Sequence, residues 1–197
     1  MNITLMVIAI ASLLLVPGPT NTLLVVSGST VGARGSLLLP AGELLGYVLS
    51  TSFLILIIAP FVGRNSALSS VFCLLCACIL AYQALMLAKG AVCYSAEPRS
   101  AVITPVRVAL VTFFNPKNLV LAFVIFPRAG FEAKQLGEWF LYFGPICLLM
   151  GSVWIFAGAA LGSLTEKVFR ANWFYWAGSA ALSTFSVLLL TSALVSA

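Results

Sequence analysis

A single lysine lies at the centre of an apolar segment that is long enough to cross a bilayer. Lys117 falls near the middle of residues 107–127, within the sequence Asn115-Pro116-Lys117-Asn118. A charge at that depth costs about 2.5–3.5 kcal/mol on insertion scales, so it requires a compensating role. An ammonium can bind a substrate carboxylate or exchange a proton. The alternative is that Pro116 opens the helix and Lys117 only hydrogen-bonds the freed carbonyls.

A second proline break lies late in the first apolar segment. Pro17-Gly18-Pro19 removes two backbone donors, and we expect a new half-helix to begin at Thr20 and Asn21, which are both good caps. The free N–H groups and the positive end of its dipole would then face an anionic group such as a carboxylate. Both breaks together predict a mid-membrane substrate site formed by Pro17, Gly18, Pro19, Thr20, Asn21, Asn115, Pro116, Lys117 and Asn118. A substrate amino group would meet the oxygens of Asn21 and Asn115.

One acid lies inside a predicted span. Glu43 is about six residues into the second apolar segment, or ~9 Å at 1.5 Å per residue. It could carry a coupling proton, a role that Lys117 could also fill. Equally, it could be an interfacial acid that pairs with Arg34.

The composition narrows the classes of protein. Hydrophobic residues make up 62% of the 197 residues and charged residues 8%, which is too little charge to cover a soluble fold. The chain contains no His and no Asp, so catalytic triads and His-ligated metals are excluded. We expect that the protein is not an enzyme and that it binds no metal, cofactor or nucleic acid. The five cysteines, including the cluster Cys73, Cys76 and Cys78, are interpreted as small packing residues.

Six apolar segments predict an all-α integral membrane protein of one transmembrane domain, residues 1–197. They are residues 3–26, 37–61, 66–88, 107–127, 139–162 and 173–195. The polar connection 89–106 divides them into two three-helix repeats, 3–88 and 107–197, each opening with a proline-broken helix. An odd number of spans in each half indicates an inverted-topology repeat.

The loop charges predict the orientation. With both termini outside, six basic residues face the cytoplasm and three face outward. The inner residues are Arg34, Lys89, Arg99, Arg107, Lys167 and Arg170, and the outer ones are Arg64, Arg128 and Lys134. The connection 89–106 is therefore predicted to be cytoplasmic.

Small and aromatic residues have more ordinary interpretations. Gly42 with Gly46, and Gly158 with Gly162, have the spacing that lets helices approach closely. We favour packing within the chain and leave a homodimer face open. The tryptophans and tyrosines that mostly flank the last two spans, Trp154 among them, are interpreted as interfacial anchors.

With these motifs in view, the chain resembles the LysE/RhtB family of amino-acid exporters. The resemblance rests on Pro17-Gly18-Pro19, the turn Gly32-Ala33-Arg34-Gly35, Gly42, Gly46, Tyr82, Asn115-Pro116-Lys117-Asn118, Phe126-Pro127 and Gly178. It covers nearly the whole chain. It implies export of an amino acid or a similar small metabolite across the bacterial inner membrane in exchange for protons. Glu43 stands where the family usually has an uncharged residue, and residues 82–86 lack the family's usual Trp and Gly, which leaves the substrate open.

Other classes of membrane protein share some of these features. A thiol-disulfide electron carrier also has six spans, an inverted repeat and broken helices, but it needs a reactive Cys beside each break, and these breaks contain none. A passive channel, a lipid-modifying enzyme and an uptake carrier are the further alternatives. The lone Lys and lone Glu leave little for acid-base catalysis, whereas the direction of transport is not written in the sequence.

Overall fold

The computed structural model describes residues 3–62, 66–92, 103–126 and 133–162, together with scattered residues between 176 and 191. Every regular element in these described residues is helical. The all-α prediction is therefore confirmed for this part of the chain. The sixth predicted span, 173–195, is represented only by the scattered residues, which are also helical.

The first predicted span is a bent pair of helices. α1 (Ile3–Leu15) and α2 (Pro19–Ser36) meet at 64°. The helix is interrupted because Pro17, which lies between them, and Pro19, which begins α2, cannot donate backbone hydrogen bonds. Gly18 precedes α2 in an extended conformation and no side chain caps this helix, so the predicted start and capping at Thr20 and Asn21 are wrong. Gly32 has a φ of +79°, which favours glycine, and the helix path turns there.

The second and third predicted spans are longer helices. α3 (Leu39–Phe53) continues without a gap through the π-helical segment η1 (Leu54–Ile58) into α4 (Ala59–Val62). α5 (Ser66–Val92) follows and is 27 residues long. α5 starts at the predicted residue but ends at Val92 and not at residue 88, so the helix extends past Lys89, where the charge pattern predicted its end.

The fourth predicted span repeats the broken design of the first. α6 (Pro105–Phe113) is capped by Thr104, whose hydroxyl accepts a hydrogen bond from Arg107 N at 3.2 Å. After the break at residues 114–116, α7 (Lys117–Val120) leads into a second π-helical segment, η2 (Leu121–Ile125). The two arms meet at 59°. The last long element is α8 (Ala133–Gly162).

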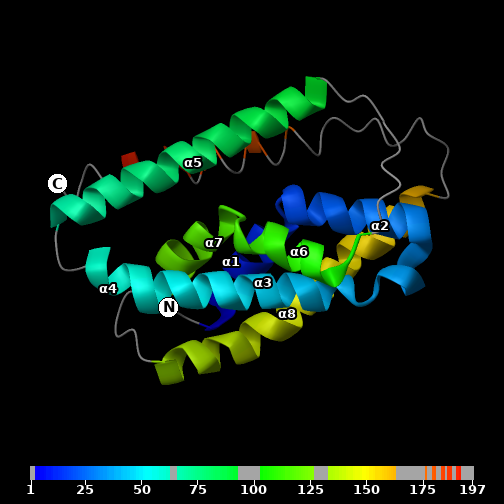
Figure 1. Ribbon diagram of the computed structural model, residues 1–197, viewed down its shortest axis with the longest axis horizontal. Helices are drawn as coiled ribbons and strands as arrows, with labels where there is room; N and C mark the ends of the chain where they lie inside the picture. Colours follow the sequence, from blue (N-terminus) through cyan, green and yellow to red (C-terminus); the bar gives the residue numbers. More distant parts are fainter. Residues whose placement is uncertain are drawn as a thin grey trace.

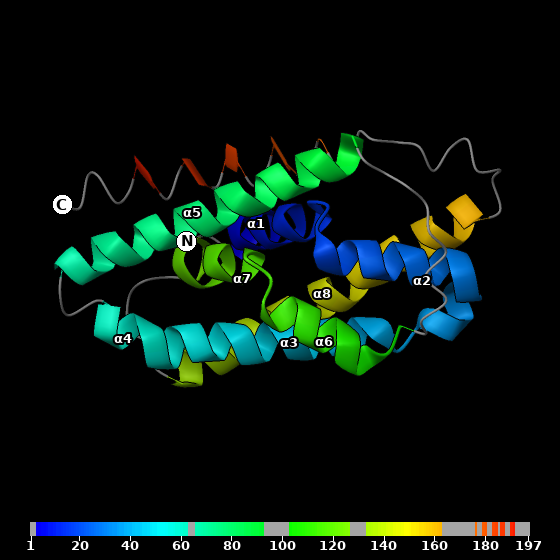
Figure 2. The same ribbon diagram turned by 45° about the horizontal axis from the view of Figure 1, so that its top comes forward.

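The two bent pairs lie side by side and run in opposite directions (Figures 1 and 2). α1 packs against η2 while α2 packs against α6, so the start of each pair lies beside the end of the other. α3 packs between α6 and α8, and α8 also contacts α1 and α2. This arrangement brings the two breaks together inside the bundle.

Glycines allow these close contacts. A Cβ on Gly42 would overlap the carbonyl oxygen of Pro105, and one on Gly46 would lie 2.7 Å from Thr112 Cβ, so both glycines press α3 onto α6. Gly158 contacts the backbone of Val25 in the same way, which joins α8 to α2. Packing within the chain is therefore confirmed for these three positions. The structure describes the backbone of Gly162, at the end of α8, but not its surroundings.

Length and composition support a membrane location for several helices. Leu39–Ile58, with 20 residues, and Leu136–Ala160, with 25, are each apolar enough to cross a bilayer. Each bent pair adds a further candidate span if its two arms are counted together, which makes up to 4 among the described residues. The count of six spans stays a prediction.

Candidate functional site

The first break exposes main-chain carbonyls at the end of α1, and side chains from three helices satisfy them. The amide nitrogen of Asn21 donates to Leu14 O at 2.9 Å and to Val16 O at 2.8 Å. The indole nitrogen of Trp154, on α8, also donates to Leu14 O, at 3.2 Å. Asn21 therefore reaches back across the break instead of capping its own helix. Trp154 is buried, so its interpretation as an interfacial anchor is wrong.

At the second break, an asparagine side chain again donates to main-chain carbonyls at the end of the preceding helix. The amide nitrogen of Asn118 donates to Thr112 O at 2.6 Å and to Phe113 O at 3.2 Å, which are the last carbonyls of α6. Asn115 Oδ1 accepts a hydrogen bond from Lys117 N at 3.1 Å and so starts the next arm. In each half, an asparagine that follows the proline thus binds carbonyls that the break leaves without helical partners.

Polar side chains also join the two breaks directly. Thr20 Oγ1 lies 3.1 Å from Thr112 Oγ1, and the amide nitrogen of Asn115 donates to Thr20 Oγ1 at 3.0 Å. All three residues are buried. The predicted site residues Thr20 and Asn115, which are 95 positions apart, are therefore in contact.

Lys117 connects the halves through its charge. Its side chain is only 1% exposed, and its ammonium donates to Val16 O, the carbonyl that Asn21 also binds. A Cβ on Gly18 would lie 3.4 Å from the Lys117 nitrogen, so Gly18 covers this charge. Lys117 does bind a main-chain carbonyl that a proline break frees, as expected if its role were only structural. The carbonyl belongs to the other half of the protein, however, and an ammonium has three N–H groups.

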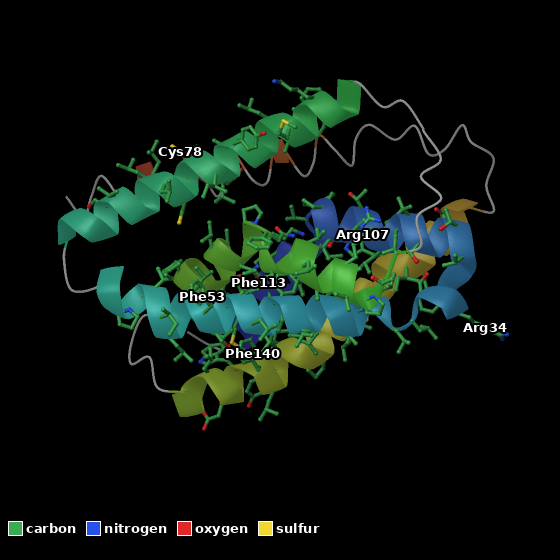
Figure 3. The ribbon with its side chains drawn as sticks, in the orientation of Figure 1. Arg34, Phe53, Cys78, Arg107, Phe113 and Phe140 are labelled. Atoms are coloured by element: carbon green, nitrogen blue, oxygen red, sulfur yellow. The ribbon has the colours of Figure 1, made fainter. Side chains whose placement is uncertain are left out.

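Glu43 lies in the same region and is 2% exposed. The charge that acts on it is Lys117, which lies close enough for an electrostatic interaction. Figure 3 shows Arg34 at the far end of α2, pointing away from the bundle, and this side chain is exposed. The interpretation of Glu43 as an interfacial acid paired with Arg34 is therefore wrong. A Cβ on Gly151 of α8 would lie 2.6 Å from Glu43 Oε2, so Gly151 leaves the space for this carboxyl group.

Sequence reasoning missed a polar face of α3. Glu43, Tyr47 and Thr51 are spaced four residues apart, so they lie on one side of the helix. All three are buried, and each has a side-chain oxygen without a hydrogen-bond partner. Across from them on α8, the ring of Phe143 lies 5.4 Å from that of Tyr47. Cys147, one turn further along α8, is buried in the same side-chain cluster as Tyr47 and Phe143. The i, i+4, i+8 spacing of polar residues in an apolar segment was the available signal.

Known families can now be compared with this arrangement. The sequence model of the LysE type translocator family matches residues 11–194. The chain belongs to this family. Its members are transporters and not enzymes, and the membership makes this translocator a multi-pass membrane protein for amino acids or similar compounds. No curated protein and no solved structure matches the chain.

The translocator therefore presents a buried polar cluster in an apolar bundle. The cluster consists of Glu43 on α3, Lys117 on α7, the asparagines of both breaks and the main-chain carbonyls at the ends of α1 and α6. Its chemistry suits the reversible binding of a small molecule that carries charged groups of its own. Of the cysteines, Cys147 is buried beside Tyr47, whereas Cys78 is exposed on α5, away from the breaks (Figure 3).

Proposed function

We propose that the protein is a secondary transporter that exports an amino acid or a similar small metabolite across the bacterial inner membrane by proton antiport. The substrate binds between the two broken helices, at the residues predicted from the sequence. The observation that carries this proposal is the Lys117 ammonium, which donates across the halves to Val16 O in the opposite break. One charge therefore joins both breaks, and a change at either break reaches the other.

Lys117 is the proposed partner of the substrate carboxylate. One of its N–H groups faces Val16 O, which leaves two for an anion. The first turn of α2 adds the positive end of a helix dipole close by, because Gly18 lies against Lys117. The positive features therefore point to the anionic end of a zwitterion.

The bent pairs supply a way to alternate access. They run antiparallel and meet at their breaks, which supports two inverted repeats at residues 3–88 and 107–197. The loop charges favour both termini outside and the connection 89–106 in the cytoplasm. Rocking one repeat against the other would then expose the cluster to each side in turn.

Counterflow in proteoliposomes tests this function. Purified protein is reconstituted with each unlabelled standard amino acid inside, and uptake of the same labelled amino acid is measured. We expect transient accumulation of at least one amino acid, which a passive channel cannot produce. Accumulation should depend on Lys117 and should be driven by an imposed proton gradient. Absence of counterflow for all of them, in protein that is shown to be folded, would overturn the proposed export of an amino acid.

A further inference from the structure

We propose that Glu43 binds the primary ammonium of the substrate, and that the same carboxyl group carries the exchanged proton when no substrate is bound. The transported molecule must then carry an ammonium with free N–H groups. This inference rests on the proposed function and names the substrate class and the coupling residue of that site.

The first step is the identity of the atoms that lack partners. Among the described residues, three buried oxygens of amide and carboxyl groups accept no hydrogen bond: Asn21 Oδ1, Asn118 Oδ1 and Glu43 Oε2. The buried hydroxyls of Tyr47 and Thr51, which can donate or accept, also lack partners. The two amide nitrogens face main-chain carbonyls, which can only accept, so the amide oxygens are necessarily the atoms left over. Leaving such groups unsatisfied costs about 1–3 kcal/mol each. The cluster therefore favours a ligand that donates.

The second step is the position of these acceptors around Lys117. Asn21 and Lys117 share the carbonyl of Val16, and Asn118 follows Lys117 directly in the chain. Glu43 lies within electrostatic range of the Lys117 ammonium, and α3 packs against α7. The residues that carry the three acceptors thus belong to the buried cluster that contains Lys117.

The third step is the chemistry of the ligand. A primary ammonium has three donors and no acceptor, which matches three acceptors without donors. A carboxylate has acceptors only and would find no donor at these oxygens. The Lys117 ammonium donates no hydrogen bond to Glu43 Oε2: it donates to Val16 O, and Glu43 Oε2 has no hydrogen-bond partner. Glu43 is therefore the charged end of an ammonium site.

The exchange balances in charge at the carboxyl group of Glu43. Because the Lys117 ammonium donates to Val16 O and not to Glu43 Oε2, the buried carboxylate needs a second cation or a bound proton to be stable. When the substrate ammonium arrives, the O–H bond of Glu43 breaks, the proton leaves to water, and the ammonium takes its place beside the carboxylate. When the substrate leaves, a proton returns to the carboxylate. One ammonium therefore exchanges for one proton at a single group.

Proton release from the purified full-length protein tests this exchange without knowledge of the substrate. Protein in detergent and weak buffer, with a pH-sensitive dye, receives n-butylammonium chloride, tetramethylammonium chloride or sodium butyrate at constant ionic strength. We expect butylammonium to release about one proton for each bound cation. Tetramethylammonium has no N–H group and should release none, and neither should butyrate. Equal release by tetramethylammonium would overturn the proposal.

Variants then locate the proton. Glu43→Gln should abolish release by butylammonium, whereas Glu138→Gln, which changes an exposed acid on α8, should behave like the wild type. Undiminished release from Glu43→Gln would overturn the assignment. The comparison of the three salts on the wild type needs no variant, so a misfolded Glu43→Gln protein leaves the proposal open to refutation.

The counterflow assay separates this inference from the proposed function. If amino acids exchange but butylammonium releases no proton, the ammonium site is wrong and the transporter stands. If butylammonium releases a proton that depends on Glu43 while no amino acid exchanges, the site stands and the transported molecule is a different amine.

Discussion

Replacing Lys117 by Met separates a binding role from a structural role. Met is close in length and uncharged, so the change removes the charge and keeps most of the volume. The structure indicates that Val16 O stays satisfied, because Asn21 still donates to it at 2.8 Å. The variant loses a charge-assisted hydrogen bond worth about 1.5–3 kcal/mol and avoids a burial cost of about 2.5–3.5 kcal/mol. The net effect on stability should therefore lie between a loss of about 0.5 and a gain of about 2 kcal/mol.

Transport should respond in the opposite way. The same hydrogen bond to a substrate carboxylate is lost without compensation, so apparent affinity in counterflow should fall roughly ten- to hundredfold. Exchange by Lys117→Arg should also be impaired, since the planar guanidinium group of Arg does not reproduce the geometry of a compact ammonium. Yield, size-exclusion profile and thermal unfolding report folding, and labelled amino-acid counterflow reports binding and exchange.

Two controls make the result for Lys117→Met decisive. Lys89→Met changes an exposed lysine on α5 and should leave both folding and exchange unaltered. The double variant Lys117→Met with Glu43→Gln removes both buried titratable groups. It should fold even if Lys117→Met alone is destabilised by the remaining carboxyl group of Glu43. Exchange at the wild-type rate by folded Lys117→Met would refute the binding role.

Further predictions follow from the contacts of the cluster. Gly151→Ala should cut exchange by about tenfold or more, because its Cβ would lie 2.6 Å from Glu43 Oε2 and ordinary contact begins at 3.4 Å, which requires a displacement of 0.8 Å. Gly144→Ala on the same helix meets its nearest neighbour at 3.9 Å and should transport normally, so equal losses would argue against the role of Glu43. Tyr47→Phe removes a buried hydroxyl without a partner and should leave the melting temperature unchanged or higher, which a thermal scan checks. A reporter fused after Gly90 should indicate cytoplasm, and a periplasmic signal would reverse the orientation. Replacing all cysteines by Ala should preserve counterflow, whereas loss of activity in folded protein would support a thiol-based mechanism.

Local chemistry made part of the site predictable. Proline has no backbone N–H, so Pro17-Gly18-Pro19 and Pro116 had to interrupt their helices, and the structure bends at both. Lys117 was identified by the burial cost of a charge in an apolar segment, and its side chain is indeed buried. The family could also be identified from these motifs, as the match over residues 11–194 confirms.

Tertiary structure decided the partners. Trp154 donates to a carbonyl 140 positions away, and Lys117 to one 101 positions away. Such pairs form only when α1, α7 and α8 pack together, and no local pattern encodes that packing. The same holds for Glu43, whose sequence neighbourhood suggested Arg34, whereas the fold buries it beside Gly151 and near Lys117.

The sequence by itself therefore determined where the helices break and which charge is buried, because both follow from the backbone and solvation chemistry of single residues. Only the tertiary structure decided that Lys117 donates to Val16 O in the opposite break, and that Glu43, Tyr47 and Thr51 face the bundle interior. The physical reason is that hydrogen bonds and burial depend on which helices become neighbours. That choice is made by close glycine contacts between helices distant in the chain, as between Gly158 and Val25.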